Sequence, residues 1–368
     1  MRAKAFVIAL LFLLTSLASA VTRSAPKPVT KRNTKPQAKA PASRLSKSRR
    51  PARYVQTWKA PTYGEPTEGD SVEGEDPAIR RAAVAALGNL NGSVVVTDAS
   101  TGRILTIVNQ KLAFKSGFTP CSTIKVVAAM GGLMEGNIDR ATKLPVGWRS
   151  KMDLTYALAH SNNPYFAHVG TQLGFDKVLH YSRLFGLGER AGLDLAAEQP
   201  GTLPPAIPRE GLGMMTSFGS GINLTPLQLA AALGAIANGG TLYWLQYPRT
   251  EEDLDRFLPR AKRQLEIGEV LDEIKPGLAG TVDYGTGRRA KYEADETIFG
   301  KTGTCTHSDN QTHLGWFGSF HQMGDRKLVV VVLLTGGRPV NGPVASGIAG
   351  EVYKNLAKAR TLAQNQLR

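Results

Sequence analysis

The chain has 368 residues, of which 42% are hydrophobic and 20% charged, so it can bury a large apolar core. Its formal net charge of +15 comes from one end, because residues 1–60 contain 14 Lys and Arg and no acidic residue. The other 31 basic and 30 acidic residues nearly cancel. Binding to nucleic acid is possible on charge alone, but the export pattern of the first segment argues against it, so we expect no nucleic-acid partner.

The first segment of the chain has the pattern of an export signal. Residues 5–20 are apolar, follow Arg2 and Lys4, and end in the small-x-small sequence Ala18-Ser19-Ala20. We therefore predict a signal peptide over residues 1–20 and an exported protein of the periplasm or cell envelope. Sixteen residues are short for a spanning helix, which needs about 20, yet an uncleaved anchor in the inner membrane remains the alternative.

A linker is predicted over residues 21–78, where a basic tail is followed by an acidic stretch at 65–76. The tail is rich in Lys, Arg, Pro, Ala and Ser without apolar periodicity, which is typical of a disordered segment. We favour a solvated spacer; the alternative is attachment to anionic lipid or anionic envelope polymers. The acidic stretch is a candidate partner of the tail, and the folded domain is expected at 79–368.

The elements of this domain follow in a clear order. Two strands at 92–98 and 103–108 form a hairpin through Ser100-Thr101-Gly102. Helical patterns run from 122 to about 240 and include a buried helix over 122–131 and a capping box at Thr225 and Gln228. Strands are predicted near 297–305, 312–320 and 327–335, and a helix over 342–359. We expect an α+β fold in which terminal helices flank an antiparallel sheet of about five strands, with a helical subdomain inserted.

Three short motifs carry the candidate chemistry: Ser122-Thr123-Ile124-Lys125, Ser161-Asn162-Asn163 and Lys301-Thr302-Gly303-Thr304. Each motif alone occurs often by chance. A serine hydroxyl needs a base to become a nucleophile, and Lys125 would lie one helical turn after Ser122 on the same face. The combination and order of the three motifs predict a serine acyl-transfer site.

Residues 90 to 357 resemble the transpeptidase domain of class B penicillin-binding proteins, in the superfamily that includes the serine β-lactamases. Beyond the motifs, the resemblance rests on Gly92–Asp98, Phe185–Gly188, Asn223–Gly240 and Gly285-Thr286-Gly287. It implies a peptidoglycan D,D-transpeptidase that attacks the D-Ala-D-Ala end of a stem peptide. The terminal D-Ala leaves, and the remaining peptidyl group is transferred to an amine. A β-lactam antibiotic would acylate the same serine, and a lipid-linked glycan polymerase is a candidate partner.

The resemblance also implies a role for each motif residue. Ser122 would be the nucleophile, Lys125 its base, and Ser161 a proton relay to the leaving group. Substrate binding would fall to the amide of Asn163 and to the carboxylate-binding motif Lys301, Thr302, Gly303 and Thr304. The backbone N–H groups of Ser122 and Thr304 would form the oxyanion hole.

The two cysteines flank the first and third motifs. Cys121 precedes Ser122, and Cys305 follows Thr304. Some class A carbapenem-hydrolysing β-lactamases have a disulfide at these two places, so the resemblance implies a Cys121–Cys305 bridge, which export favours. The alternative is a pair of small buried apolar side chains.

Other functions remain as alternatives. A D,D-carboxypeptidase shares the acyl-enzyme and differs only in transferring the acyl group to water. A serine β-lactamase is suggested by the cysteines, but Glu198 and Glu210 lack the Glu-x-x-Leu-Asn context of class A enzymes. A β-lactam sensor and an inactive scaffold are disfavoured. The histidines show no metal-binding spacing, so we expect no metal or cofactor; His307 or His313 could touch substrate, although a plain loop position is favoured.

Overall fold

The computed structural model describes residues 57–115, 117–193 and 195–366. The predicted signal peptide, 1–20, and the basic tail up to residue 56 lie outside the described residues. Residues from Val55 onward form one compact unit. Within the described part of this unit, no helix combines the length and apolarity that are needed to cross a membrane.

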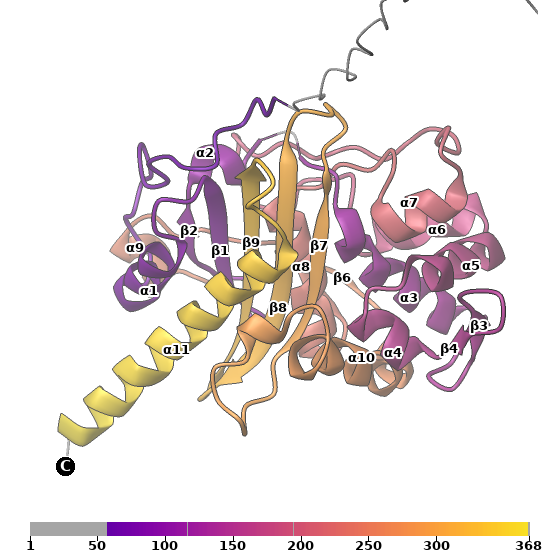
Figure 1. Cartoon of the computed structure of the whole chain (residues 1–368). Helices are drawn as coiled ribbons and strands as arrows, with labels where there is room; N and C mark the ends of the chain where they lie inside the picture. Colours follow the sequence, from indigo (N-terminus) through magenta and orange to yellow (C-terminus); the bar gives the residue numbers. More distant parts are fainter. Residues whose placement is uncertain (1–56, 116, 194, 367–368) are drawn as a thin grey trace, which may run out of the picture. The chain divides into compact units, whose positions relative to one another are not determined.

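The centre of the fold is an antiparallel five-stranded sheet with the strand order β2-β1-β9-β8-β7 (Figure 1). The predicted hairpin and the three predicted late strands are all present, and together they supply every strand of this sheet. Their bounds are β1 Gly92–Asp98, β2 Ile104–Val108, β7 Phe299–Thr306, β8 His313–Met323 and β9 Arg326–Gly336. Because β7 lies at one edge, only one side of its backbone is paired, and alternate N–H and C=O groups point away from the sheet.

Both faces of the sheet are covered by helices. On one face, Val94 and Val330 pack with the terminal helices α1 (Pro77–Leu87) and α11 (Gly342–Gln366). On the other face, Val95 packs with the buried helix α8 (Pro226–Asn238). Side chains alternate between the faces of a strand, so a strand buried on both faces reads as a continuous apolar run. This explains the unbroken valines and leucines of β1 and β9.

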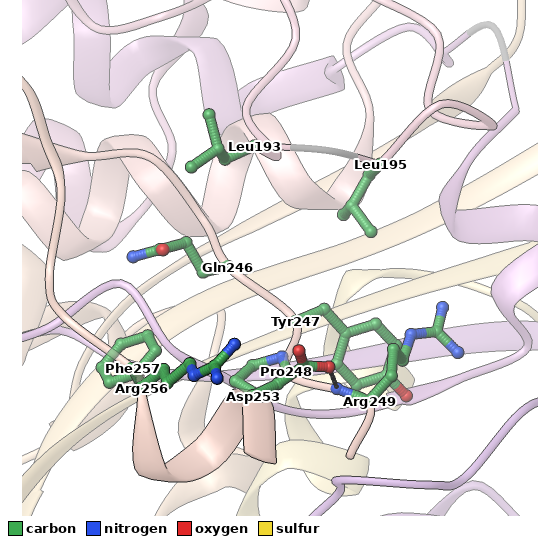
Figure 2. Close-up of a pocket in the computed structure, with 9 residues that line it drawn as sticks. All are labelled: Leu193, Leu195, Gln246, Tyr247, Pro248, Arg249, Asp253, Arg256 and Phe257. Atoms are coloured by element: carbon green, nitrogen blue, oxygen red, sulfur yellow. Dashed lines mark hydrogen bonds between the residues drawn. The ribbon is translucent and has the colours of Figure 1, made fainter. Parts of the chain in front are cut away.

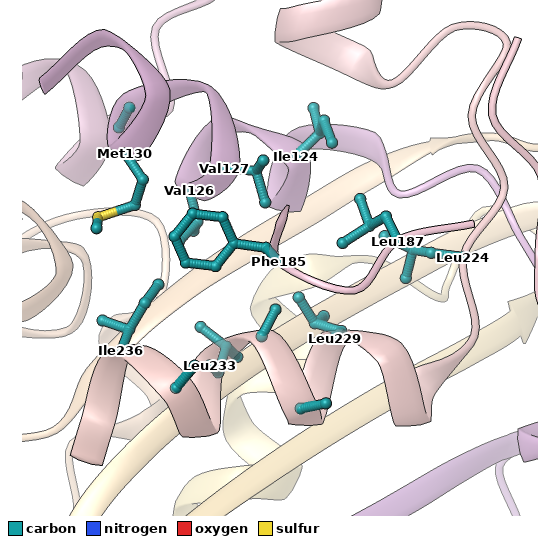
Figure 3. Packing of buried hydrophobic residues seen from close by; sticks show 14 of the residues in the cluster. Ile124, Val126, Val127, Met130, Phe185, Leu187, Leu224, Leu229, Leu233 and Ile236 are labelled. Carbon is teal, nitrogen blue, oxygen red and sulfur yellow. The ribbon is translucent and has the colours of Figure 1, made fainter. Parts of the chain in front are cut away.

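The helical subdomain lies between β2 and β7 in sequence, as predicted. Its helices are α2 Gln110–Ala113, α3 Lys125–Met134, α4 Leu154–Ala159, α5 Asn163–Leu173, α6 Phe175–Leu184, α7 Leu212–Phe218, α8, α9 Glu251–Asp255 and α10 Leu271–Asp283. Two small sheets pair β3 (Leu144–Pro145) with β4 (Lys151–Met152) and β5 (Thr241–Tyr243) with β6 (Ala261–Gln264). Phe185 packs between α3 and α8, which joins the subdomain to the helix that covers the sheet (Figure 3).

Helix α8 confirms the predicted capping box. The Thr225 hydroxyl accepts the N–H of Gln228, and the Gln228 side chain accepts the N–H of Thr225. Pro226 occupies the first turn, where its missing N–H costs nothing. The C-terminal helix α11 extends to Gln366, beyond the predicted end at 359, because no Pro or Gly follows to stop it.

The acidic stretch differs from the predicted linker. The carboxylates of Asp70 and Glu75 both pair with Arg80 of α1, and both are about 1% exposed. Glu75 also accepts hydrogen bonds from the Thr106 hydroxyl and from the Ile107 N–H of β2. Residues 70–76 are therefore packed on the domain, because Arg80 supplies a nearby cation and β2 supplies donors for a buried carboxylate.

Candidate active site

Ser122, the candidate nucleophile, lies on a tight turn that leads into α3. Residues Cys121–Ile124 form a 3-10 turn, and the α-helix begins only at Lys125. The sequence prediction of an α-helix starting at Ser122 was wrong in this detail. In a 3-10 turn the side chains at i and i+3 eclipse each other, which places Ser122 and Lys125 side by side, as expected. Cys121 enters the turn at φ 52°, a left-handed conformation unusual for a non-glycine residue.

Lys125 connects the first motif to the second. Its Nζ atom lies 2.6 Å from Oγ of Ser122, 2.7 Å from Oδ1 of Asn163 and 2.7 Å from the carbonyl oxygen of Ser217. The Lys125 side chain is fully buried and Ser122 is 8% exposed. A neutral amine has two N–H donors and one lone pair. It can therefore donate to the amide and carbonyl oxygens while it accepts the Ser122 hydroxyl proton.

The electrostatics of the site favour that neutral amine. Burial lowers the pKa of Lys125 to about 6, with a further contribution from the positive charge of Lys301. Burial alone lowers the pKa of Lys301 to about 7. In both cases the low-dielectric interior disfavours the ammonium form. At neutral pH Lys125 is mostly unprotonated, which is the state a base requires.

Two side chains hold the chain that leads into the turn at Ser122, and His313 makes a separate contact. The indole Nε1 of Trp316 in β8 donates to the carbonyl of Thr119 at 3.0 Å. Nδ1 of His307 accepts the N–H of Thr119 at 3.2 Å. Nδ1 of His313 lies 2.7 Å from the carbonyl oxygen of Val340. Both histidines thus have partners within the domain; His307 lies in a loop, as favoured, whereas His313 is the first residue of β8.

The second motif lies between α4 and α5. Asn162 caps α5 by accepting the N–H of Tyr165, and Asn163 reaches Lys125. Ser161 has a left-handed backbone at φ 56°, and its N–H donates to the carbonyl of Leu158. Among the described residues, the Ser161 hydroxyl makes no hydrogen bond. The structure therefore joins Asn163 to Lys125 of the first motif, whereas it shows no such contact for the Ser161 hydroxyl in the part of the chain that it describes.

The third motif lies on the edge strand β7. Lys301 is 1% exposed, and its Nζ donates to the carbonyl of Thr302 at 3.1 Å. The Thr302 hydroxyl lies 2.5 Å from the hydroxyl of Thr286. The Thr304 hydroxyl accepts the N–H of Gly342 at the start of α11. Within the described residues, no carboxylate pairs with the buried amine of Lys301.

Cys121 and Cys305 connect the first motif to the third. Their sulfur atoms are bonded, and their Cα atoms are 5.5 Å apart. The close approach needs Gly303, since a Cβ atom there would lie 3.0 Å from the Pro120 carbonyl oxygen and 3.2 Å from Cβ of Cys121.

Two contributors to the site were not predicted from the sequence as functional groups. The Ser217 carbonyl could not be recognised from the amino-acid type, because every residue has a backbone carbonyl. A prediction that the Trp316 indole contacts the chain before Ser122 would have required knowing which loop faces β8. Thr286 was noted only within the Gly285-Thr286-Gly287 pattern.

The two glutamates weighed as β-lactamase bases lie away from these contacts. The buried carboxylate of Glu198 accepts the N–H groups of Ala191 and Gly192 at 3.0 and 2.7 Å. Glu210 is exposed in the segment before α7. In the part of the chain that the structure describes, neither bonds to Ser122 or Lys125.

A cavity of about 400 Å³ lies apart from the three motifs (Figure 2). Its polar side chains serve local structure: Asp253 accepts N–H groups at the start of α9, and Arg256 pairs with Glu252. The described residues contain no cluster of three or more His, Cys, Asp or Glu side chains with metal-binding geometry.

Comparison with known proteins agrees with this arrangement. The chain is 30% identical over 285 residues to stage V sporulation protein D of Bacillus subtilis, covering 68% of this chain and 43% of that protein. It is 24% identical to the peptidoglycan D,D-transpeptidase MrdA of Acinetobacter baumannii, covering 76% of this chain and 52% of the relative. The chain thus spans about half the length of these relatives.

Solved structures show the same fold. The transpeptidase domain of penicillin-binding protein 3 from Burkholderia pseudomallei superposes with a TM-score of 0.67 at 20% identity, covering 81% of this chain and 98% of that domain. The family model for the penicillin binding protein transpeptidase domain matches residues 92–358, which include all three motifs. The chain therefore belongs to the penicillin-binding protein transpeptidase family.

Proposed function

We propose that this protein is a peptidoglycan D,D-transpeptidase that acts through an acyl-enzyme at Ser122. The observation that carries the proposal is the arrangement at Lys125, a buried amine with a lowered pKa lying 2.6 Å from the serine hydroxyl. An activated nucleophile with an adjacent base is the requirement for covalent acyl transfer.

In the proposed reaction, Lys125 takes the proton of Ser122 as the hydroxyl attacks the carbonyl carbon of the penultimate D-Ala. The N–H groups of Ser122 and Thr304 stabilise the oxyanion. Ser161 delivers a proton to the departing D-Ala, and Asn163 binds the amide of the donor peptide. These residue roles are inferences from the family resemblance and from the contacts described above.

Lys301 is the proposed binding site for the terminal carboxylate, together with Thr302, Gly303 and Thr304. Among the residues that the structure describes, its buried amine has no acidic partner, so a bound carboxylate would supply the opposite charge. The carboxylate of a β-lactam offers the same partner, which supports acylation of Ser122 by these antibiotics.

Among the alternatives, β-lactamase activity is the less supported. Rapid hydrolysis of the acyl-enzyme needs a base for water, and Glu198 already accepts two backbone N–H groups. Carboxypeptidase activity shares every residue named here and differs only in the acceptor. We therefore place transpeptidation first and carboxypeptidation second.

We further propose that the protein is exported and that the Cys121–Cys305 bridge forms in the oxidising envelope. Support comes from the apolar segment at 5–20 and from the pairing of the cysteines in the structure. Retention of an uncleaved anchor, contact of the basic tail with anionic polymers or lipid, and a glycan polymerase partner remain predictions from the sequence.

Intact-mass spectrometry after mixing with benzylpenicillin tests the proposal. We expect a long-lived adduct on the wild type and on the Ser100→Ala control, which removes an exposed serine, and none on Ser122→Ala. A transient adduct with accumulating hydrolysed drug would indicate a β-lactamase. The absence of any adduct on the wild type would refute an acylating serine enzyme.

A further inference from the structure

An exposed aromatic cluster lies beside the active site. Its members are Tyr156 of α4, His160 at the end of α4 and Tyr284 at the end of α10. The ring centroids are 5.6 Å apart for Tyr156 and His160, 5.8 Å for Tyr156 and Tyr284, and 5.9 Å for His160 and Tyr284. Tyr156 is 53% exposed and Tyr284 is 44% exposed. Mutually contacting exposed rings from two elements form a surface suited to binding a partner molecule.

Short segments connect this cluster to two motifs. His160 directly precedes Ser161, the proposed proton relay to the leaving group. Tyr284 is two residues before Thr286, whose N–H donates to the carbonyl of Ala159 and whose hydroxyl contacts Thr302. Helices α4 and α10 lie side by side (Figure 1), and the Thr281 hydroxyl of α10 lies 3.3 Å from a carbonyl oxygen of α4. The cluster therefore lies next to the second motif and to the Thr286 contact with the third motif.

The local fold supports the ring of Tyr284. A Cβ atom at Gly280 would lie 2.6 Å from the Tyr284 hydroxyl oxygen, so only glycine leaves space for the ring over α10. Burial raises the pKa of the Tyr284 hydroxyl, and the nearby carboxylates of Asp153 and Asp283 add to the increase. Asp283 is paired with Lys291, whereas Asp153 caps α4. Aromatic faces near carboxylates attract a cation.

We propose that Tyr156, His160 and Tyr284 form the docking surface for the acceptor, an amine carried on an alkyl chain. This inference rests on the proposed function. The acceptor must approach where the D-Ala amine has left, because both nitrogens bond to the same carbonyl carbon. The alkyl chain packs on the rings, and its ammonium group is attracted by their faces before it enters the cleft.

The transfer step balances as follows. The ammonium first loses one proton to solvent, and the neutral nitrogen then attacks the ester carbonyl of the acyl-enzyme. A C–N bond forms and the bond from the carbonyl carbon to Oγ of Ser122 breaks. A second proton leaves the nitrogen and returns to Oγ through Ser161 or Lys125. The products are the amide and the free enzyme.

Partitioning of the acyl-enzyme tests the proposal. The donor is a thioester of N-benzoyl-D-alanine, and the acceptors are Nα-acetyl-lysine, which has an amine on an alkyl chain, and hydroxylamine, which is too small to need a docking surface. The variants are Tyr156→Leu with Tyr284→Leu, which keeps apolar bulk and removes the aromatic faces, and Tyr63→Leu, a control at another exposed tyrosine. The ratio of amide to hydrolysed acid is measured for each acceptor.

We expect the double variant to lower this ratio about tenfold for Nα-acetyl-lysine, with the hydroxylamine ratio and the rate of acylation by benzylpenicillin unchanged. Equal ratios in variant and wild type, an equal loss for both acceptors, or a loss of acylation in the folded variant would overturn the inference. So would a wild type that hydrolyses the thioester but never transfers to the lysine derivative. Failure of the wild type to be acylated at all would instead refute the proposed function.

Discussion

Replacement of Lys125 by methionine should change how the stability of the protein depends on pH. In the unfolded chain a lysine has a pKa near 10.4, whereas burial in the fold lowers that of Lys125 to about 6. Between these two values the unfolded state binds one more proton than the folded state. The free energy of unfolding of the wild type therefore increases as the pH rises from 6 towards 10.

The expected size follows from this proton difference. One proton corresponds to about 1.36 kcal/mol for each pH unit. Between pH 7 and pH 9 the unfolded lysine remains charged and folded Lys125 remains neutral, so the wild type should gain about 2.5 kcal/mol relative to Lys125→Met. Packing and hydrogen bonds lost in the variant shift its stability equally at both pH values, and they cancel from this difference.

Urea unfolding of wild type and Lys125→Met at pH 7 and pH 9 measures the effect. The matched comparison is Lys354→Met, which removes an exposed lysine on α11 and should follow the wild type at both pH values. If the unfolding free energies of wild type and Lys125→Met change in parallel with pH, Lys125 is protonated in the fold and cannot serve as the base.

Three further predictions concern the site and its supports. The second-order rate constant for acylation by benzylpenicillin should rise through about pH 6 as Lys125 becomes neutral and fall above about pH 7 as Lys301 loses its charge. These apparent pKa values belong to the coupled pair of lysines. A pH profile without the alkaline decrease would contradict the proposal that Lys301 binds the carboxylate of the drug. Replacing Cys121 and Cys305 by serine should lower the free energy of unfolding by about 5 kcal/mol on the loop-entropy model, because the cysteines are 184 residues apart. A reductant should destabilise the wild type but leave the double variant unchanged. Equal sensitivity of the two proteins to reductant would argue against the bridge. Glu75→Ala should lower the free energy of unfolding by about 3 kcal/mol, since it removes the buried acceptor of the Thr106 hydroxyl and the Ile107 N–H. The exposed neighbour variant Glu73→Ala should cost little, and similar losses at both positions would show that burial of Glu75 does not contribute.

Much of the fold was predictable because its signals are local. The hairpin of β1 and β2 follows from apolar runs separated by a glycine turn, and α8 follows from its capping box and its proline. Each of these signals acts within a few residues, so no tertiary contact is needed to recognise it. The three motifs were recognisable for a related reason, since acyl transfer needs specific residue types at short spacings.

The acidic stretch at 65–76 shows where local reasoning ends. Its composition is typical of a linker, yet Asp70 and Glu75 are buried because Arg80 and the edge of β2 lie opposite them. Charge composition predicts solvation only when the chain offers no buried partner. That partner was determined by how α1 packs on the sheet.

The sequence by itself determined the strands of the sheet, the helical region between them, the C-terminal helix and the residue types that acyl transfer requires. Only the tertiary structure decided how the site works. The pKa of Lys125 is lowered because the side chain is buried near Lys301, and its amine contacts the carbonyl of Ser217, although these residues are far apart in the chain. The aromatic cluster likewise exists only because α4 packs beside α10. Burial, charge proximity and backbone partners are properties of the folded packing, so no spacing along the sequence could specify them.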